Sequence, residues 1–221
     1  MLVRDPSGFS KKGDEMMSKL FLELAKPEGG ILRSEMLEQI KIISGQVVAC
    51  DPLVSHNQPF ERTIQPGTYP VVAWWHEEEE RIAATELKFS DALPIRWEMA
   101  TRPGQNLNEL KEGTIYGYPV DTGLGCFADV EAIDKLDELD AKLQRDLGED
   151  FISLYDNLVS DVLAEHEDNW GNVIVCEDKK LNVVMFSSGY GDGFYASYWG
   201  FDEENRIVSL ITDFNIIATH P

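Results

Sequence analysis

The stretch from Ser187 to Phe214 constrains the fold most strongly. It reads SSGYGDGFYASYWGFDEENRIVSLITDF, which is a glycine-rich turn, an aromatic strand, a charged turn and an apolar strand that ends in an acid. This order is typical of a β-hairpin. An earlier stretch, from Tyr118 to Asp129, also runs from a strand into a glycine turn that presents an aspartate. We therefore expect two carboxylate-bearing turns to lie near each other in a fold built on antiparallel strands.

Other short runs rich in β-branched and aromatic residues, bounded by proline, glycine and charged residues, predict further strands. Those before residue 102 are QVVACDPL, PFERTI, TYPVVAWWH, RIAATELKF and PIRWEMA, and a strand follows at 114–120. After residue 171, NVIVCED, NVVMFSSG, GFYASYWGF and RIVSLITDF are separated by turns short enough for a four-stranded meander. In the run TYPVVAWWH, strand geometry places Trp74 and Trp75 on opposite faces, one in the core and the other partly exposed.

Helical spacing of apolar residues occurs at the start and in the middle of the chain. It predicts a helix at 14–25, a short helix at about 34–40, and two central helices at 129–147 and 150–166. Gly148 separates the central helices, which suggests an antiparallel pair, and Asp129 is a capping residue for the first of them.

The order of strands, helix pair and strands predicts an α+β fold, mostly antiparallel β-sheet, with an N-terminal helical extension and a central helix pair. We expect the helical extension to span residues 1–44 and a single β-rich domain to span 45–221. The predicted core consists of Val71, Val72, Ile82, Leu87, Trp97, Val120, Phe127, Leu136, Leu139, Leu154, Leu158, Val173, Val175, Val183, Met185, Tyr198, Leu210 and Ile211.

The most unusual property of the composition is its charge. The chain has 40 acidic and 19 basic residues, for a net charge of −21 at pH 7. Such a field repels phosphates and anionic membranes and attracts cationic partners, so we expect no nucleic-acid or membrane partner. The alternative interpretation is that the charge only maintains solubility.

Three features of the sequence indicate the cellular compartment of the protein. No run approaches the roughly 18 to 20 apolar residues that a membrane span needs, and the first residues lack the features of a secretory signal. Three widely spaced cysteines, Cys50, Cys126 and Cys176, favour reduced thiols over a disulfide framework. We therefore expect a cytoplasmic protein.

Several blocks of sequence occur together in a recognisable order. They are VACDPL at 48–53, PFERTIQPGTYPVV at 59–72, RIAATEL at 81–87, IRWEMA at 95–100, VDTGLGCFAD at 120–129, SGYGDGFYASYWGFD at 188–202 and TDF at 212–214. In these blocks, over roughly residues 45–214, the chain resembles a mostly bacterial family catalogued as domain of unknown function 4241. The resemblance implies a compact, β-rich cytosolic domain and brings no established activity or functional residue.

One functional hypothesis is a hydrolase that depends on a divalent metal ion. Asp121, Asp129 and Asp192 are candidate catalytic residues, and Asp121, Asp192 and Asp213 are candidate oxygen ligands. Carboxylates on glycine turns can converge on magnesium or calcium, and a bound ion can activate water. The alternative is a local role for each of them, in which Asp129 caps a helix and Asp121 and Asp192 stabilise their own turns.

Cys126 is a candidate nucleophile, because it lies between a glycine turn and the start of a helix. No histidine is near it in the sequence to act as a base, since His56, His76, His166 and His220 are scattered along the chain. The alternative, a buried small thiol, is favoured.

The competing hypothesis is an acidic cytosolic protein that binds a basic protein, for instance an immunity-type inhibitor of a basic toxin or enzyme. An acidic surface steers a cationic partner into contact, and exposed aromatic residues anchor it. The candidate binding residues are Trp75, Tyr190, Tyr195 and Trp199, each of which has core packing as its alternative role. This hypothesis needs no cofactor, whereas the hydrolase needs a divalent cation. A third hypothesis is a regulatory module with a small-molecule pocket between the helices and the sheet.

Overall fold

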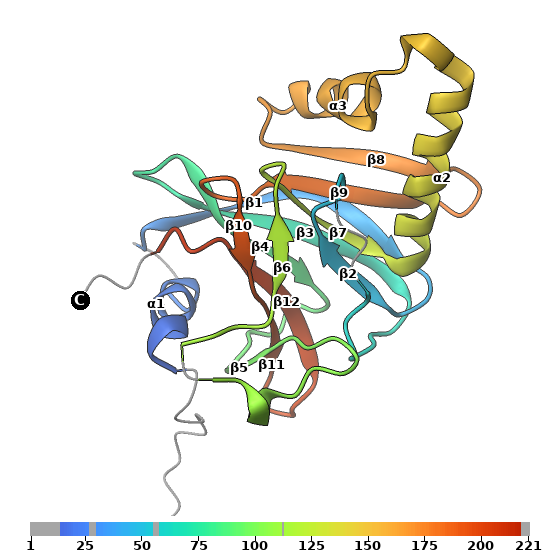
Figure 1. Ribbon diagram of the computed structural model, residues 1–221. Coiled ribbons are helices and arrows are strands. Elements are labelled where there is room, and N and C mark those ends of the chain that lie inside the picture. The colour runs from blue at the N-terminus through green and yellow to red at the C-terminus, as the bar shows by residue number, and fades with distance from the viewer. Residues whose placement is uncertain (1–13, 27–29, 55–57, 112, 218–221) are drawn as a thin grey trace, which may run out of the picture.

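The structure, a computed structural model, describes residues 14–26, 30–54, 58–111 and 113–217 (Figure 1). Two antiparallel sheets of six and four strands form the body, and helices pack against their outer faces. The predicted α+β class, dominated by antiparallel strands, is therefore confirmed.

The larger sheet has the spatial order β1-β3-β4-β12-β11-β5. Its strands are β1 (Leu32–Ile42), β3 (Gly67–His76), β4 (Arg81–Lys88), β5 (Arg96–Met99), β11 (Ser197–Phe201) and β12 (Ile207–Asp213). The predicted hairpins of neighbouring strands, β3 with β4 and β11 with β12, are both present. β12 lies between β4 and β11, so the last strand in the sequence is a central strand of this sheet.

The smaller sheet has the order β2-β7-β9-β8. Its strands are β2 (Val47–Cys50), β7 (Leu124–Asp129), β8 (Trp170–Cys176) and β9 (Leu181–Ser187). A separate two-stranded ribbon pairs β6 (Tyr118–Val120) with β10 (Gly193–Tyr195). This ribbon brings together the two glycine turns in which the sequence predicts neighbouring carboxylates.

The main core fills the space between the two sheets. Along β7, Phe127 faces this core, whereas Cys126 and Ala128 face the opposite side of the smaller sheet. This alternation follows from the two-residue period of a strand. Leu87 and Trp199 of the larger sheet meet Phe127 in the same core.

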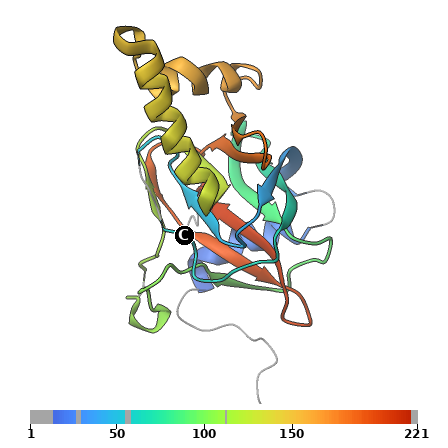
Figure 2. The same ribbon diagram turned by 90° about the vertical axis from the view of Figure 1, so that its right-hand side faces the viewer.

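Helices cover the outer faces of both sheets, on opposite sides of the molecule (Figures 1 and 2). α1 (Asp14–Leu24) packs on the larger sheet, where the ring of Phe21 lies 4.5 Å from Trp97 and 5.4 Å from Tyr198. α2 (Val130–Leu147) and α3 (Ser160–Ala164) pack on the smaller sheet. No helix within the described part of the chain combines the length and apolar character needed to cross a bilayer.

The predicted central helix pair is present, but its second member is shorter than expected. It starts as a π-helical segment at Tyr155–Val159 and continues into α3, which ends at Ala164. Gly148 ends α2 with a φ of +57°, a value that glycine adopts without the steric cost of a side chain. The space between the helices and the smaller sheet, where a small-molecule pocket was one hypothesis, contains packed apolar side chains such as Leu136 and Leu163.

The prediction of a short helix at 34–40 is wrong, because this segment belongs to β1 and pairs with β3. A bulge between Met36 and Glu38 shifts the register of β1 by one residue. It leaves Leu37 and Ile40 buried three residues apart, a spacing that also occurs on a helix. Among the described residues before residue 45, the helical ones thus belong to α1, and β1 forms an edge of the main sheet.

Three further differences concern strands. PFERTI at 59–64 forms no strand, and β7 was not predicted as one. The four-stranded meander is also wrong, because β8 and β9 belong to the smaller sheet while β11 and β12 belong to the larger one. Of the predicted core, five members are only partly buried and the rest are buried; the five are Val72, Trp97, Leu139, Leu158 and Val175.

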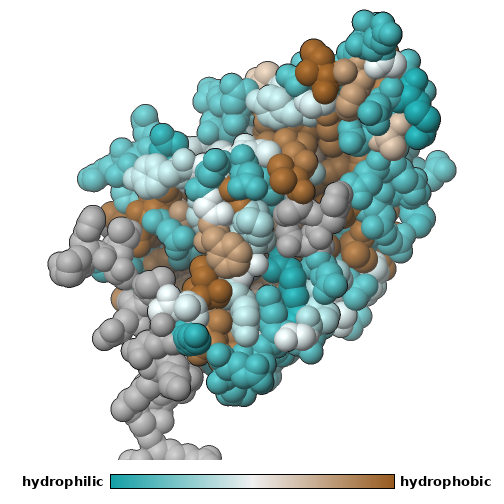
Figure 3. Space-filling model, viewed as in Figure 1, coloured by the Kyte–Doolittle hydropathy of each residue, from teal (hydrophilic) through white to brown (hydrophobic). Residues whose placement is uncertain are grey.

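Hydrophilic side chains cover most of the face shown in Figure 3, as the strongly acidic composition predicts. Hydrophobic side chains on this face gather around the layer of α2 and α3. Ile152 in the connection between these helices is 75% exposed, and Tyr155 is also exposed.

Candidate functional site

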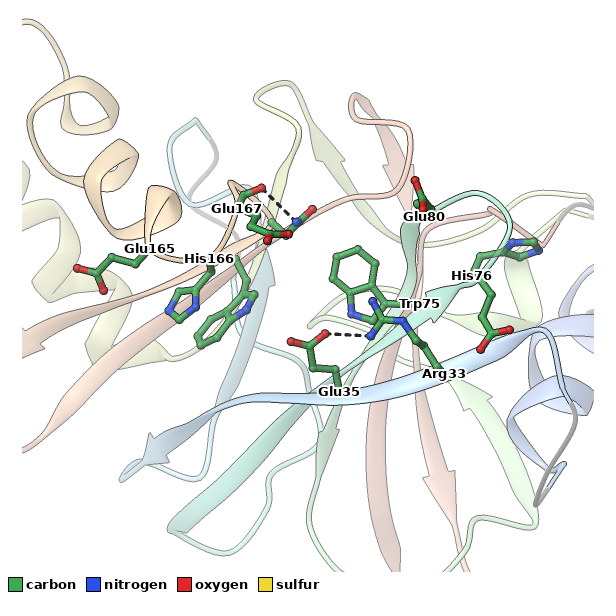
Figure 4. Close-up of a pocket in the computed structure, with 11 residues that line it drawn as sticks. Arg33, Glu35, Trp75, His76, Glu80, Glu165, His166 and Glu167 are labelled. Carbon is green, nitrogen blue, oxygen red and sulfur yellow. Dashed lines mark hydrogen bonds and ion pairs between the residues drawn. The ribbon is translucent and has the colours of Figure 1, made fainter.

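A cleft of about 790 Å³ lies between the two layers of the molecule (Figure 4). One wall is formed by the start of β1, the end of β3 and the turn that follows β3. The other wall is the loop from α3 into β8, with the first residue of β8. The cleft therefore joins segments that are far apart in the sequence.

The first wall is built by the pairing of β1 with β3. Arg33 lies directly opposite Trp75, and Glu35 lies opposite Ala73, so their side chains share the face that looks toward the second sheet. The Arg33 guanidinium carbon is 4.8 Å from the centre of the Trp75 ring, and Arg33 Nη1 donates to Glu35 Oε2 at 3.2 Å. A cation already lies on the aromatic floor of the cleft, which shows that the site is compatible with positive charge.

Trp75 is the most buried residue of this wall, with 7% of its surface exposed. Its indole nitrogen is buried and has no hydrogen-bond partner among the described residues. Figure 4 shows this indole beside the Arg33–Glu35 pair. Buried donors are nearly always paired, so an unpaired one on the wall of a cleft indicates a place for an acceptor from outside the chain.

The second wall is shaped by a tight loop. Glu167 and Asp168 have φ values of +55° and +61°, and Asp168 N donates to Leu163 O. Two successive left-handed residues turn the chain sharply from α3 into β8. The His166 ring stacks on Trp170 with ring centres 3.5 Å apart. A second aromatic surface thereby lines the cleft opposite Trp75.

The cleft is strongly acidic. Five glutamates line it, against a single arginine; they are Glu35, Glu77, Glu80, Glu165 and Glu167. His76 and His166, which are scattered in the sequence, are brought to the same cleft from opposite walls. Carboxylates gathered in a concave surface focus a negative potential, so the cleft favours cationic groups.

A buried amide fixes the position of β1 just beyond the cleft. Asn182 of β9 donates through Nδ2 to Gln39 O and to Asn172 Oδ1, both at 2.8 Å, and its Oδ1 accepts from Lys41 N at 3.0 Å. The asparagine thus bonds one outward backbone group of each of residues 39 and 41 on the outer edge of β1. Sequence reasoning missed Asn182, because nothing local distinguishes it from an ordinary strand asparagine.

The two predicted carboxylate turns do lie side by side. Gly193 pairs with Val120, and Ser188 N donates to Gly123 O at 3.0 Å. Asp121 and Asp192 are exposed on these turns. The structure therefore confirms the expected adjacency of the turns.

The other two candidate aspartates of the hydrolase hypothesis, Asp129 and Asp213, have different environments. Asp129 is fully buried, and its carboxylate accepts four hydrogen bonds, from Ile43 N, Ser44 N, Ser44 Oγ and Glu131 N, each at 2.8 Å. It caps α2 as predicted and also holds the β1–β2 turn. Asp213 accepts from Asn215 N, and burial raises its pKa to about 6. Among the described residues, no group of three or more His, Cys, Asp or Glu side chains is arranged to hold a metal ion.

An aspartate that the sequence analysis did not single out organises the first of these turns. Asp51 is buried, and its carboxylate accepts from Asp121 N, Thr122 N, Thr122 Oγ1 and Leu53 N at 2.9 to 3.0 Å. The signal that could have identified it is ACDPL, in which an aspartate precedes a proline at the end of a strand.

Cys126 is a buried thiol in the middle of β7, as the favoured interpretation predicts. Its Sγ atom is 3.5 Å from Cys50 Sγ, and burial raises the pKa of the Cys126 thiol well above its ordinary value. A high pKa and an inaccessible sulfur both oppose a nucleophilic role. His56 and His220, two of the possible bases, lie outside the described residues.

The predicted aromatic contacts divide into accessible and core residues. Tyr190 is 62% exposed, its hydroxyl donates to Glu79 Oε2, and the Arg81 guanidinium lies 5.2 Å from its ring centre. Tyr195 and Trp199, in contrast, are buried, so their prediction as contacts with a partner is wrong. The two-residue period of the strands turns both of them into the core. Trp75 alone of the four lines the cleft.

A two-sheet α+β protein with an acidic, tryptophan-lined cleft is thus the class that fold and site define. The chain belongs to the family described as "Protein of unknown function (DUF4241)", whose model matches residues 40–212. The resemblance noted in the sequence is therefore confirmed. No match was found among curated proteins or among solved structures.

Proposed function

We propose that the protein is a non-catalytic, cytoplasmic binding protein for a basic protein partner, of the kind in which an immunity protein neutralises a basic toxin or enzyme. The observation that carries this proposal is the cleft, in which five glutamates face two tryptophans. The surrounding net charge of −21 acts in the same direction, because it raises the rate at which a cationic partner is encountered.

The chemistry of the cleft supports binding in preference to turnover. The exposed carboxylates Glu77 and Glu80 lie in a turn after β3, while the aromatic rings of Trp75 and Trp170 are held by the two walls. Aromatic anchors surrounded by charged groups are typical of protein interfaces. The metal-dependent hydrolase remains the alternative, resting on Asp121 and Asp192 on their adjacent turns.

The test is a pull-down of the tagged full chain from a lysate of its own host, with partners identified by mass spectrometry. We expect one basic protein at close to equal stoichiometry, released by raising the salt concentration because exposed charges are screened. Capture of no basic protein, or capture that is indifferent to salt, would contradict the proposal.

The double variant Asp121→Asn/Asp192→Asn is the matched control, because it removes two exposed carboxylates outside the cleft. We expect it to capture the partner as well as the parent chain does. The same variant tests the hydrolase in metal analysis and a panel of ester and phosphate substrates. Activity in the parent chain that the variant loses would favour the hydrolase.

A further inference from the structure

The outer edge of β1 has a free half and a covered half. Glu77 N donates to Ile31 O, so the carbonyl of residue 31 faces β3, while Ile31 N donates to Glu23 Oε2 of α1. Backbone groups alternate in direction along an antiparallel strand, which turns those of Leu32, Ser34 and Met36 outward. Within the described part of the chain, no neighbouring strand covers them, since β1 is the edge of its sheet.

The bulge between Met36 and Glu38 marks the boundary between these halves. Beyond it, Asn182 bonds the outward carbonyl of Gln39 and the outward N–H of Lys41. Before it, the free edge runs beside Arg33 and Glu35, which line the cleft. An unpaired strand edge is a template for an added strand, and this one lies beside an acidic cavity.

We propose that the cleft receives an extended basic segment of a partner protein, which pairs with the free edge of β1 at 32–36 and places a lysine or arginine side chain among the cleft glutamates. The inference rests on the proposed function and specifies where and how the partner binds. Pairing with the edge supplies the register, and the charge of the cleft selects the side chain.

Alternation explains why one segment satisfies both features. In a strand added beside β1, every second side chain lies on the face that carries Arg33 and Glu35. Those side chains enter the cleft, where five glutamates outnumber the one arginine. Basic residues at alternate positions are therefore favoured, and acidic ones are repelled.

The arrangement around Trp75 shows how the cleft accommodates a cation before a partner arrives. Arg33 lies over the ring and forms an ion pair with Glu35, with about half of the Arg33 side chain exposed. An exposed ion pair of this kind contributes little to stability, so an incoming cation displaces it readily. Once Arg33 moves, the unpaired Trp75 indole nitrogen can donate to a carbonyl of the bound segment.

The experiment uses the full chain, labelled with ¹⁵N, and a synthetic peptide of about nine residues in which arginine alternates with threonine, a length that spans the free edge. Calorimetry gives the affinity at low salt, and the indole N–H resonance of Trp75, assigned with Trp75→Phe, reports the site. We expect the peptide to bind and to shift that resonance.

Two variants separate the parts of the proposal. Ser34→Pro removes an outward N–H donor from the exposed edge, where proline is tolerated. Glu35→Lys/Glu167→Lys reverses charge on both walls. We expect each variant to lower the affinity for the peptide by about tenfold or more, as the loss of a strand contact or a charge pair does. Glu203→Lys, an exposed site in the β11–β12 turn, is the charge control and should change the affinity by less than about twofold.

Several results would overturn the inference. Equal weakening by Glu203→Lys would show attraction by net charge alone, and undiminished binding to Ser34→Pro would exclude strand addition. Spermidine binding as tightly as the peptide would identify the cleft as a site for free amines. If a basic protein from the host is captured equally by the parent chain and by Glu35→Lys/Glu167→Lys, the proposed function stands and the cleft is not its site.

Discussion

Replacing Asp129 by alanine should destabilise the protein more than almost any other single change of a charged residue. The carboxylate is fully buried and accepts four hydrogen bonds at 2.8 Å. One of them caps α2, and the others hold Ile43 and Ser44 in the β1–β2 turn. A single side chain therefore connects the larger sheet, the smaller sheet and the helical layer.

The magnitude follows from these contacts. Loss of a helix cap costs about 0.5 to 2 kcal/mol. Each backbone N–H left without its partner at a buried site costs about 1 to 3 kcal/mol, and Ile43 and Ser44 each contribute one. We therefore expect Asp129→Ala to lower the free energy of unfolding by roughly 3 to 6 kcal/mol, a large part of the 5 to 15 kcal/mol of a typical domain.

Urea unfolding at pH 7, followed by tryptophan fluorescence, measures this loss. With a slope of about 3 kcal/mol per M, the midpoint should fall by about 1 to 2 M. Asp134→Asn, at an exposed position of the same helix, is the control and should change the stability by no more than about 0.5 kcal/mol. A loss below about 1 kcal/mol in Asp129→Ala, against the expected range, would refute the view that this carboxylate joins the layers.

Two further changes test other buried charges. Because burial raises the folded-state pKa of Asp213 from 3.8 to about 6, the folded protein binds a proton there more tightly than the unfolded chain does. Its contribution to stability is therefore full below pH 4 and is lost as the pH rises through 6. Between pH 4 and pH 7, the free energy of unfolding of Asp213→Asn, measured in urea, should rise relative to that of the parent chain by up to about 3 kcal/mol. Parallel pH profiles of the two proteins would contradict this. Arg102→Lys should lower the free energy of unfolding by about 2 to 4 kcal/mol in the same assay. Nε, Nη1 and Nη2 of Arg102 donate to the carbonyls of Gln58, Gly117 and Ala49, and one ammonium group cannot reach all three. An unchanged urea midpoint would contradict this.

Local sequence signals predicted the hairpins and the first central helix well. The β3–β4, β8–β9 and β11–β12 pairs each join two strand patterns through a short turn, and Asp129 before an apolar stripe identified the start of α2. In these places, the information lies within about 20 residues of sequence, and neighbouring segments meet in space.

Where the prediction failed, contacts between distant residues decided the structure. The bulge in β1 gives this strand the spacing of apolar residues that is typical of a helix. Pairing with β3 over ten positions outweighed the local preference. The cleft itself was not predicted, and of the residues that line it only Trp75 was predicted to bind a partner. His76 and His166 line opposite walls of it because the fold brings the ends of β3 and α3 to the same cleft, and no periodicity in the sequence records that approach.

The position of β12 has a consequence for synthesis of the chain. While a ribosome is still making residues 207–213, β4 has already emerged, and it lacks its partner β12 along one edge. This unpaired apolar edge is open to wrong pairing with other nascent chains until β12 inserts beside it. The larger sheet therefore closes only after β12 has been made.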